Sequence, residues 1–537
     1  HTTIRYFLAG LAAAMLVFLI LEFSPEVSAE NAKFTVCRNK ISSRCLTDLG
    51  VEIALDARSL PPYMREVGML AQMGRIEDAL ALELRVVNEK ERPPANAEEA
   101  ANRRLASHRI TAAIRAGENL ETSIDGTPAV DPGVLWISAL DLLGRDPYGV
   151  SIGPRITPDE RVLDVVSDMA ERIAGIAEQE PDHPRTSHLM YAAELQAALG
   201  NRTSAIQLLE VLPQTENPLR SPTEDLMRLV GPQNVLRLYH EAGGSRPNAL
   251  LTAASAETDM GRAAKYLERA FSEFSSEKPW PDFDWMERTV ERAANLGLEE
   301  LALQLARELA DQAKTAQSGF PVFPHIKAAR ALMVAGAGEH EVQESLALAQ
   351  SLFPRNGREI VGLGVVSGAI AWVSSGLDAE ARREIANLRA RLGEIDAAIQ
   401  IMDGIDDPVF AWNDMLTPDI SVEYLSDLFD AARGVLSREE HAYIRAQHAQ
   451  ELLFFGRTEN QRLWARATAT DLLHAEQFDG DRSVIVYSSL ARVGAQLEDQ
   501  DIQQSALERL AEAALMSRDF SDLIAAGFQW YQSDYKP

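Results

Sequence analysis

The chain is poor in aromatic side chains, which make up only 7% of its 537 residues. Its core must therefore rest on alanine, leucine, isoleucine, valine and methionine, because hydrophobic residues as a whole reach 46%. Small and aliphatic side chains suit closely packed helices better than β-sheets, where aromatic and β-branched residues are enriched. The composition favours an all-α fold over a β-sandwich.

Basic residues are also scarce, since 52 Lys and Arg stand against 80 Asp and Glu and give a net charge of −28. Such a field repels a phosphate backbone, and no basic stripe along the sequence compensates for it. We therefore expect no nucleic-acid partner and interpret the acidity as a basis of solubility.

Motifs of catalysis and cofactor binding are missing from the sequence as well. It has no G-x-S-x-G nucleophile turn and no phosphate loop. His441 and His448 are seven residues apart, with Glu440 and Glu451 nearby, and such a set could hold a metal ion. We interpret them instead as part of an exposed polar helix face, and we expect no metal, no cofactor and no enzymatic activity.

Cysteine occurs only twice, as Cys37 and Cys45. A metal site would need further ligands nearby, and no histidine lies between the two. In an exported protein such a pair is typical of a disulfide that closes a small loop. If the chain is not exported, the two residues are free thiols.

Residues 1–29 have the pattern of a secretory signal peptide. Arg5 precedes the apolar run Phe7–Leu21, and small residues at Val27 and Ala29 mark a cleavage site after Ala29. The run of about 15 residues is shorter than the roughly 20 that a membrane-spanning helix needs. An uncleaved anchor in the inner membrane, with the chain facing the periplasm, is the alternative.

The stretch Leu189–Pro213 reads as two amphipathic helices joined by a tight turn. Apolar residues recur at helical spacing on both sides of Gly200-Asn201, where glycine can end a helix in the left-handed conformation. Pro213 makes further continuation of the second helix unfavourable. The sequence therefore predicts a helical hairpin.

The same turn pattern occurs at four places: an apolar residue, glycine, four residues, alanine and an aliphatic residue. Glycine ends the first helix, and the small alanine lets the second helix pack closely against it. These glycine–alanine pairs are Gly74 and Ala79, Gly200 and Ala205, Gly297 and Ala302, and Gly393 and Ala398. With this turn the chain resembles the tetratricopeptide-repeat (TPR) family, a resemblance that implies a superhelical solenoid of antiparallel helix pairs with degenerate repeats.

The pattern divides the chain into four segments. The signal peptide is followed by an N-terminal segment, residues 30–116, with the cysteine pair and the first hairpins. Residues 117–158 are rich in glycine and proline, so we expect an irregular connecting loop in which only Val134–Leu143 could form a short helix. The main α-solenoid is expected over residues 159–537.

One aromatic cluster stands out at the start of a predicted helix: Trp280, Phe283 and Trp285. Exposed aromatic residues flanked by charge can anchor a partner peptide. Alternatively, they fasten one repeat to the next. We keep the cluster as a candidate partner-binding site.

Export signal, helix-pair repeats and missing catalytic motifs together predict an exported bacterial scaffold or adaptor in the periplasm that binds a protein or peptide partner in an envelope assembly. A second hypothesis is an accessory or catalytic subunit in peptidoglycan processing, because lytic transglycosylases also carry a helical superhelix. A third is a structural component that self-assembles.

Overall fold

The computed structural model describes residues 33–38, 40–57, 65–88, 97–128, 130–145, 158–213, 221–241, 246–276, 281–316, 322–352, 369–403, 405, 407–455, 458–475, 478 and 482–534. The predicted signal peptide lies outside these residues. The described part is helical throughout and contains no strand. None of its helices is both long and apolar enough to span a membrane.

The chain folds into two compact units. Unit 1 combines residues 1–108 with residues 445–537, and unit 2 is the continuous stretch 109–444. These units differ from the predicted segments, because the N-terminal segment shares a unit with the last part of the predicted solenoid. Two long helices, α6 (Ala97–Arg115) and α24 (Arg438–Phe455), have residues in both units.

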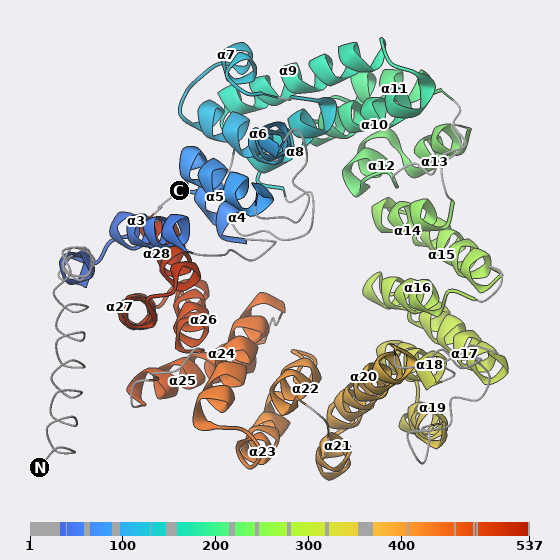
Figure 1. Cartoon of the computed structure of the whole chain (residues 1–537). Helices are drawn as coiled ribbons and strands as arrows, with labels where there is room; N and C mark the ends of the chain where they lie inside the picture. Colours follow the sequence, from blue (N-terminus) through green and yellow to red (C-terminus); the bar gives the residue numbers. More distant parts are fainter. Residues whose placement is uncertain are drawn as a thin grey trace, which may run out of the picture. The chain divides into compact units, whose positions relative to one another are not determined.

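Unit 2 is built of antiparallel helix pairs that follow one another along the chain (Figure 1). Its helices are α7 (Leu120–Asp125), α8 (Pro132–Leu142), α9 (Glu160–Ala177), α10 (Asp182–Ala198), α11 (Arg202–Glu210), α12 (Glu224–Val230), α13 (Pro232–Glu241), α14 (Arg246–Ala256), α15 (Met260–Ser275), α16 (Phe283–Asn295), α17 (Glu299–Thr315), α18 (Val322–Val334), α19 (Glu339–Ser351), α20 (Ala369–Arg391), α21 (Ile395–Met402), α22 (Pro408–Met415) and α23 (Val422–Arg433).

The even-numbered helices from α8 to α22, here called the first helices, contact one another in sequence order, from α8 with α10 to α20 with α22. Odd-numbered partners make a second row, with contacts such as α15 with α17 and α21 with α23. The expectation of an all-α fold made of TPR-like helix pairs is thus confirmed.

The four turn glycines hold the hairpins in one geometry. Their φ angles lie between +73° and +81°, and each alanine five residues later, from Ala79 to Ala398, is fully buried. At Gly200, the Asn201 N–H donates to the Gln196 carbonyl at 2.8 Å and the Gly200 N–H donates to the Ala197 carbonyl at 3.0 Å. This pair of bonds satisfies carbonyls that the helix end would leave free.

One hairpin makes the same turn without glycine. Between α26 and α27, Glu498 has a φ of 55°, and the Asp499 N–H donates to the Gly494 carbonyl at 2.9 Å. The small residue here lies on the first helix, since a Cβ at Gly494 would lie 2.5 Å from the Gln503 nitrogen. Close helix contact is preserved although the sequence pattern is not.

The glycine- and proline-rich segment is more regular than expected. Helix α7 begins after Asn119, whose side chain accepts from the Thr122 N–H, and α8 begins after Asp131. Pro132 occupies the first turn of α8, where a missing N–H costs nothing. The expected irregular loop is therefore wrong for 120–125, whereas α8 at 132–142 matches the short helix expected at Val134–Leu143. Residues 146–157 lie outside the described part.

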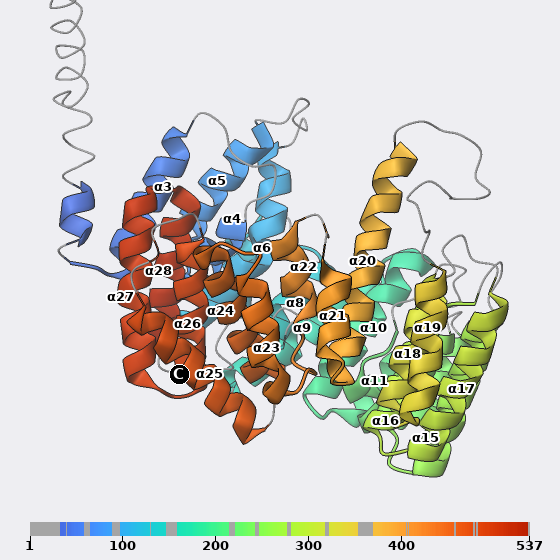
Figure 2. The ribbon, with the colours of Figure 1, turned by 90° about the horizontal axis from the view of Figure 1, so that it is seen from below.

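Unit 1 joins helices from distant parts of the sequence. They are α3 (Ser43–Asp56), α4 (Arg65–Gln72), α5 (Ile76–Asn88), α25 (Glu459–His474), α26 (Ser483–Gln496), α27 (Gln500–Ser517) and α28 (Phe520–Asp534). Helices α4 and α5 form one hairpin, and α26 and α27 form another. Between them, α3 lies beside α28, as Figures 1 and 2 show.

Helices α3 and α28 cross at two glycines. A Cβ at Gly527 would lie 2.2 Å from Thr47 Oγ1, and one at Gly50 would lie 2.8 Å from a side-chain carbon of Ile524. The Ser43 hydroxyl donates to the Gly527 carbonyl at 2.8 Å. Residues 43–47 thus face residue 527, while residue 50 faces residues 520–524. The two helices therefore run antiparallel, as in a hairpin, although no turn connects them.

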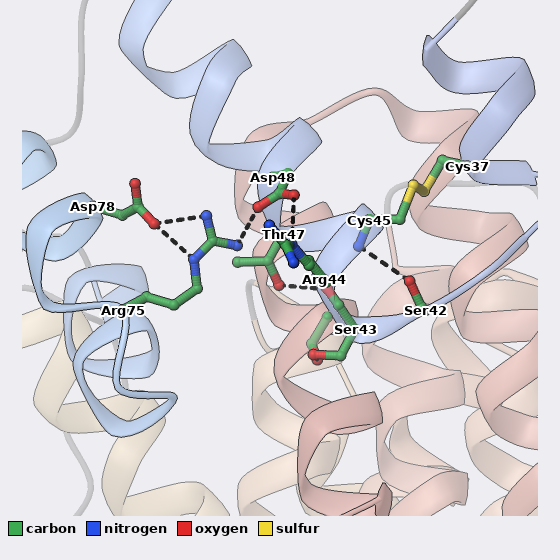
Figure 3. A network of polar contacts seen from close by, with 10 residues as sticks. Cys37, Ser42, Ser43, Arg44, Cys45, Thr47, Asp48, Arg75 and Asp78 are labelled. Carbon is green, nitrogen blue, oxygen red and sulfur yellow. Dashed lines mark hydrogen bonds and ion pairs between the residues drawn. A yellow bond between two sulfur atoms is a disulfide. The ribbon is translucent and has the colours of Figure 1, made fainter. Parts of the chain in front are cut away.

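Polar contacts also fix α3 to the α4–α5 turn (Figure 3). Arg75 contacts Asp48 of α3 at 2.7 Å and Asp78 of α5 at 2.6 Å. Cys37, which precedes α3, forms a disulfide with Cys45 in the first turn of α3, with a Cα–Cα distance of 5.6 Å. The short helical stretch 33–38 is thereby tied to α3.

Candidate partner-binding face

Phe283 and Trp285 lie at the start of α16, whereas Trp280 lies outside the described residues. The Trp285 ring stacks on Phe274 of α15, with ring centroids 5.6 Å apart and an interplanar angle of 11°. The Arg288 guanidinium covers the same ring at 4.6 Å. The side chains of Phe283 and Trp285 are partly buried against the hydrophobic core that α14 to α20 form. This geometry matches the alternative in which the cluster fastens neighbouring helices.

Charged side chains of α16 and α18 meet where these two first helices contact each other. Glu287 of α16 has a side chain that is only 5% exposed, and it lies between two cations of α18. Lys327 Nζ is 3.3 Å from Glu287 Oε2, and an Arg330 guanidinium nitrogen is 3.1 Å from Oε1. One carboxylate thus joins two first helices.

The contacts continue in both directions from this centre. Arg330 also contacts Glu384 of α20 at 3.0 Å, and Lys327 contacts Asp284 of α16 at 2.7 Å. Further along, Arg383 of α20 lies 3.4 Å from Asp414 of α22. We call this set the α16–α22 charge network: Asp284, Glu287, Lys327, Arg330, Arg383, Glu384 and Asp414.

Burial and charge oppose each other inside the network. Burial raises the pKa of Glu287, although Arg330 and Lys327 act to lower it. Burial lowers the pKa of Arg330, but Glu287 and Glu384 reverse this effect and leave it raised. The two cations stay charged, and the network holds its charges in fixed positions on adjacent helices.

An additional bridge fixes α20 to the segment after α22. The Asn387 amide is buried and donates to the Met415 carbonyl at 2.7 Å and to the Thr417 hydroxyl at 2.8 Å. Two acidic side chains near the two ends of the network, Asp284 of α16 and Asp419 after α22, are each 67% exposed. The first helices therefore carry exposed charged side chains, and buried hydrogen bonds hold these helices in position.

Histidine does not form the site that its spacing allows. His441 is 7% exposed and its ring nitrogen lies 2.9 Å from the Phe429 carbonyl, while His448 is 2% exposed and packs edge-on against Trp464. The expectation of an exposed polar face is wrong, because both rings are buried in the interior. No group of three metal-binding side chains occurs among the described residues.

Sequence reasoning missed the charge network, although a signal for it exists. Glu287 falls within the apolar face of α16, next to Met286 and Val290, both fully buried. Arg330 likewise adjoins the buried Ala329. Charged residues inside an apolar stripe need partners on the neighbouring element. That position predicts a buried pair but does not name its partner.

No family model matches the chain, and no curated protein matches it. Among solved structures, it is similar to yeast Tom70, with 12% identity, coverage of 96% of this chain and 93% of that one, and a TM-score of 0.27. A circular tandem repeat protein with novel repeat topology and enhanced subunit contact surfaces covers 90% and 98%, with 15% identity and a TM-score of 0.18. At these TM-scores neither likeness carries an argument, so the fold class rests on the helices themselves.

Proposed function

We propose that this protein is an exported helical-repeat scaffold that binds a protein or peptide partner of a bacterial envelope assembly. The observation that carries the proposal is the α16–α22 charge network, which connects four successive first helices of unit 2. Its side chains are held in place before a partner arrives, which lowers the entropy lost on binding.

The dimensions of the row suit an extended peptide. Packed helices lie about 8–10 Å apart, and an extended chain advances about 3.3 Å per residue, so each helix step corresponds to about three residues. The exposed carboxylates Asp284 and Asp419 and the mostly buried cations Lys327 and Arg330 place charges of both signs along this row. Such a surface positions a polypeptide through ion pairs and hydrogen bonds.

Export is the second part of the proposal. The pattern of residues 1–29 supports it, and the Cys37–Cys45 pair at disulfide distance fits an oxidising compartment such as the periplasm. Alkylation of thiols in intact cells should leave both cysteines unmodified until a reductant is added. Immediate alkylation of both would contradict periplasmic exposure.

Site-specific photo-cross-linking tests partner binding. A photoreactive residue replaces either Asp284 on α16 or Asp311 on α17, in the same hairpin. The two are matched, since their side chains are 67% and 77% exposed and each contacts one lysine. Cross-links to a specific envelope protein should form from position 284 only. Equal cross-linking from both positions, or glycan release from purified peptidoglycan by the protein alone, would contradict the proposal.

A further inference from the structure

The helices that meet in unit 1 also present a polar row. Helix α28 contacts both α26 and α4. Gln447 of α24 donates to the Ser489 hydroxyl of α26 at 2.9 Å, one turn from Arg492. Arg492 of α26, Gln529 of α28 and Arg65 of α4 therefore come from three adjacent helices of this unit.

Arg492 is partly buried and has no carboxylate partner among the described residues. Its neighbour Gln529 is 6% exposed. With the Gln529 amide oxygen turned toward the guanidinium, that oxygen accepts from Arg492 Nε at 3.3 Å and from Nη2 at 2.9 Å. A neutral amide orients the guanidinium but does not balance its charge.

The surroundings of Arg492 add positive charge. Burial lowers the pKa of Arg492, and the proximity of Arg65 lowers it further. Arg65 has a side chain that is 66% exposed, and its Nε lies 3.1 Å from the buried Glu66 carboxylate. Two guanidinium groups thus act on one another in a protein whose net charge is −28.

A second buried arginine shows what is unusual here. Burial also lowers the pKa of Arg391, and Arg330 lowers it further, but Asp419, Glu291 and Glu287 act to raise it. Its guanidinium lies 3.6 Å from the Asp419 carboxylate. Both arginines therefore have a cation nearby, but Arg391 also has carboxylates of the chain beside it, while no described carboxylate pairs with Arg492.

We propose that Arg492, oriented by Gln529, binds an oxyanion carried by the partner, either a carboxylate or a phosphate group. A guanidinium offers planar paired donors that match such groups, and a charged hydrogen bond in a partly dry site is strong. The assignment of the anion to a partner rests on the proposed scaffold function. The anion site itself does not, because small anions can test it alone.

Thermal unfolding of the full-length chain tests the site. Melting temperatures are compared in chloride, in acetate and in inorganic phosphate at equal ionic strength and pH. An anion that binds only the folded state raises the melting temperature. We expect such a rise in phosphate or acetate for the natural sequence and no rise for Arg492→Met. The anion that acts shows whether a phosphate or a carboxylate group is recognised.

The matched control is Arg391→Met. In chloride, Arg492→Met should melt no lower than the natural sequence, because it removes a buried charge that nothing balances. Arg391→Met removes a buried arginine that has a carboxylate neighbour, Asp419, and it should keep the response to anions. An equal anion response in Arg492→Met and the natural sequence, or none in either, would overturn the proposal. An intact anion response without cross-links from position 284 would instead refute the scaffold function alone.

Discussion

Units 1 and 2 assemble similar helix pairs from differently connected segments. In unit 2 the members of a pair follow one another in the sequence, as α16 and α17 do across Gly297. In unit 1 the pair α3 and α28 has no connection, yet its helices are antiparallel and lie closer than side chains usually permit. The comparison shows that small residues at the crossing, and not the turn, determine how closely two helices pack.

The unconnected pair should be the more fragile of the two arrangements. A short turn keeps its helices together even when their contact is weakened, because the loop-closure cost is small. The pair α3 and α28 depends on its contact surface alone. Three experiments, ordered by expected effect, test this difference, and a fourth tests a buried histidine of unit 2.

The largest effect is expected from ending the chain after Ser517, which removes α28. Leu523, Ile524 and Phe528 are fully buried, and each such side chain contributes about 1.5–3 kcal/mol. Unit 1 should lose its cooperative unfolding transition while unit 2 keeps its own. Hydrogen exchange would show lost protection in α4 and α5 and retained protection in α16–α19. Retained protection in both regions would show that α28 is dispensable.

A smaller loss is expected from Gly527→Ala, which adds one methyl group at the α3–α28 crossing. The new Cβ would collide with Thr47, and overpacking of this kind costs about 1–3 kcal/mol. Urea unfolding measures the change. Gly68→Ala in α4 is the control, because its Cβ meets no atom within 4 Å and should raise stability by about 0.5–1 kcal/mol. Equal effects of both substitutions would argue against a tight crossing.

The turns allow a reciprocal exchange. Gly200→Ala places a side chain at a φ of +81° and should lower the free energy of unfolding by about 1 kcal/mol, since its Cβ has free space and only the backbone conformation is unfavourable. Glu498→Gly should raise it by about 0.5–1 kcal/mol for the opposite reason. Urea unfolding of both variants tests the pair, and a loss of stability in Glu498→Gly would contradict it.

The smallest effect concerns pH. Burial lowers the pKa of His325 in α18 from its ordinary 6.5, and Lys314 lowers it further. The neutral form is thus favoured in the folded state, so this contribution is present above pH 6.5 and is lost as the pH falls. Stability should fall by less than about 1.4 kcal/mol per pH unit. His325→Gln should reduce the slope of unfolding free energy against pH, and an unchanged slope would refute the assignment.

Local features of the fold could be predicted from the sequence, and distant pairings could not. Gly200 and Ala205 mark a turn because the requirement for left-handed backbone and a small partner is met within six residues. The turn at Glu498 escaped because a glutamate there gives no such signal. The pairing of Ser43 with Gly527 could not be predicted, because the sequence around one residue gives no information about the other.

The candidate sites follow the same division. The disulfide partners are eight residues apart, and the sequence predicts the pair directly. Glu287 and Arg330 lie on helices separated by a whole second-row helix, so their contact is set by stacking that one sequence does not reveal. Arg492 of α26 and Arg65 of α4 approach one another because both helices pack against α28.

The α3–α28 pair has a consequence for the order of folding. Ser43 and Gly527 are 484 residues apart, so α3 leaves the ribosome long before its partner exists. Contacts between such distant residues form slowly, and an apolar surface that waits for its partner is prone to aggregate. Until synthesis reaches α28, the growing chain carries an unfinished surface at α3 that a chaperone could recognise. Unit 1 can then be completed only after synthesis has passed α28.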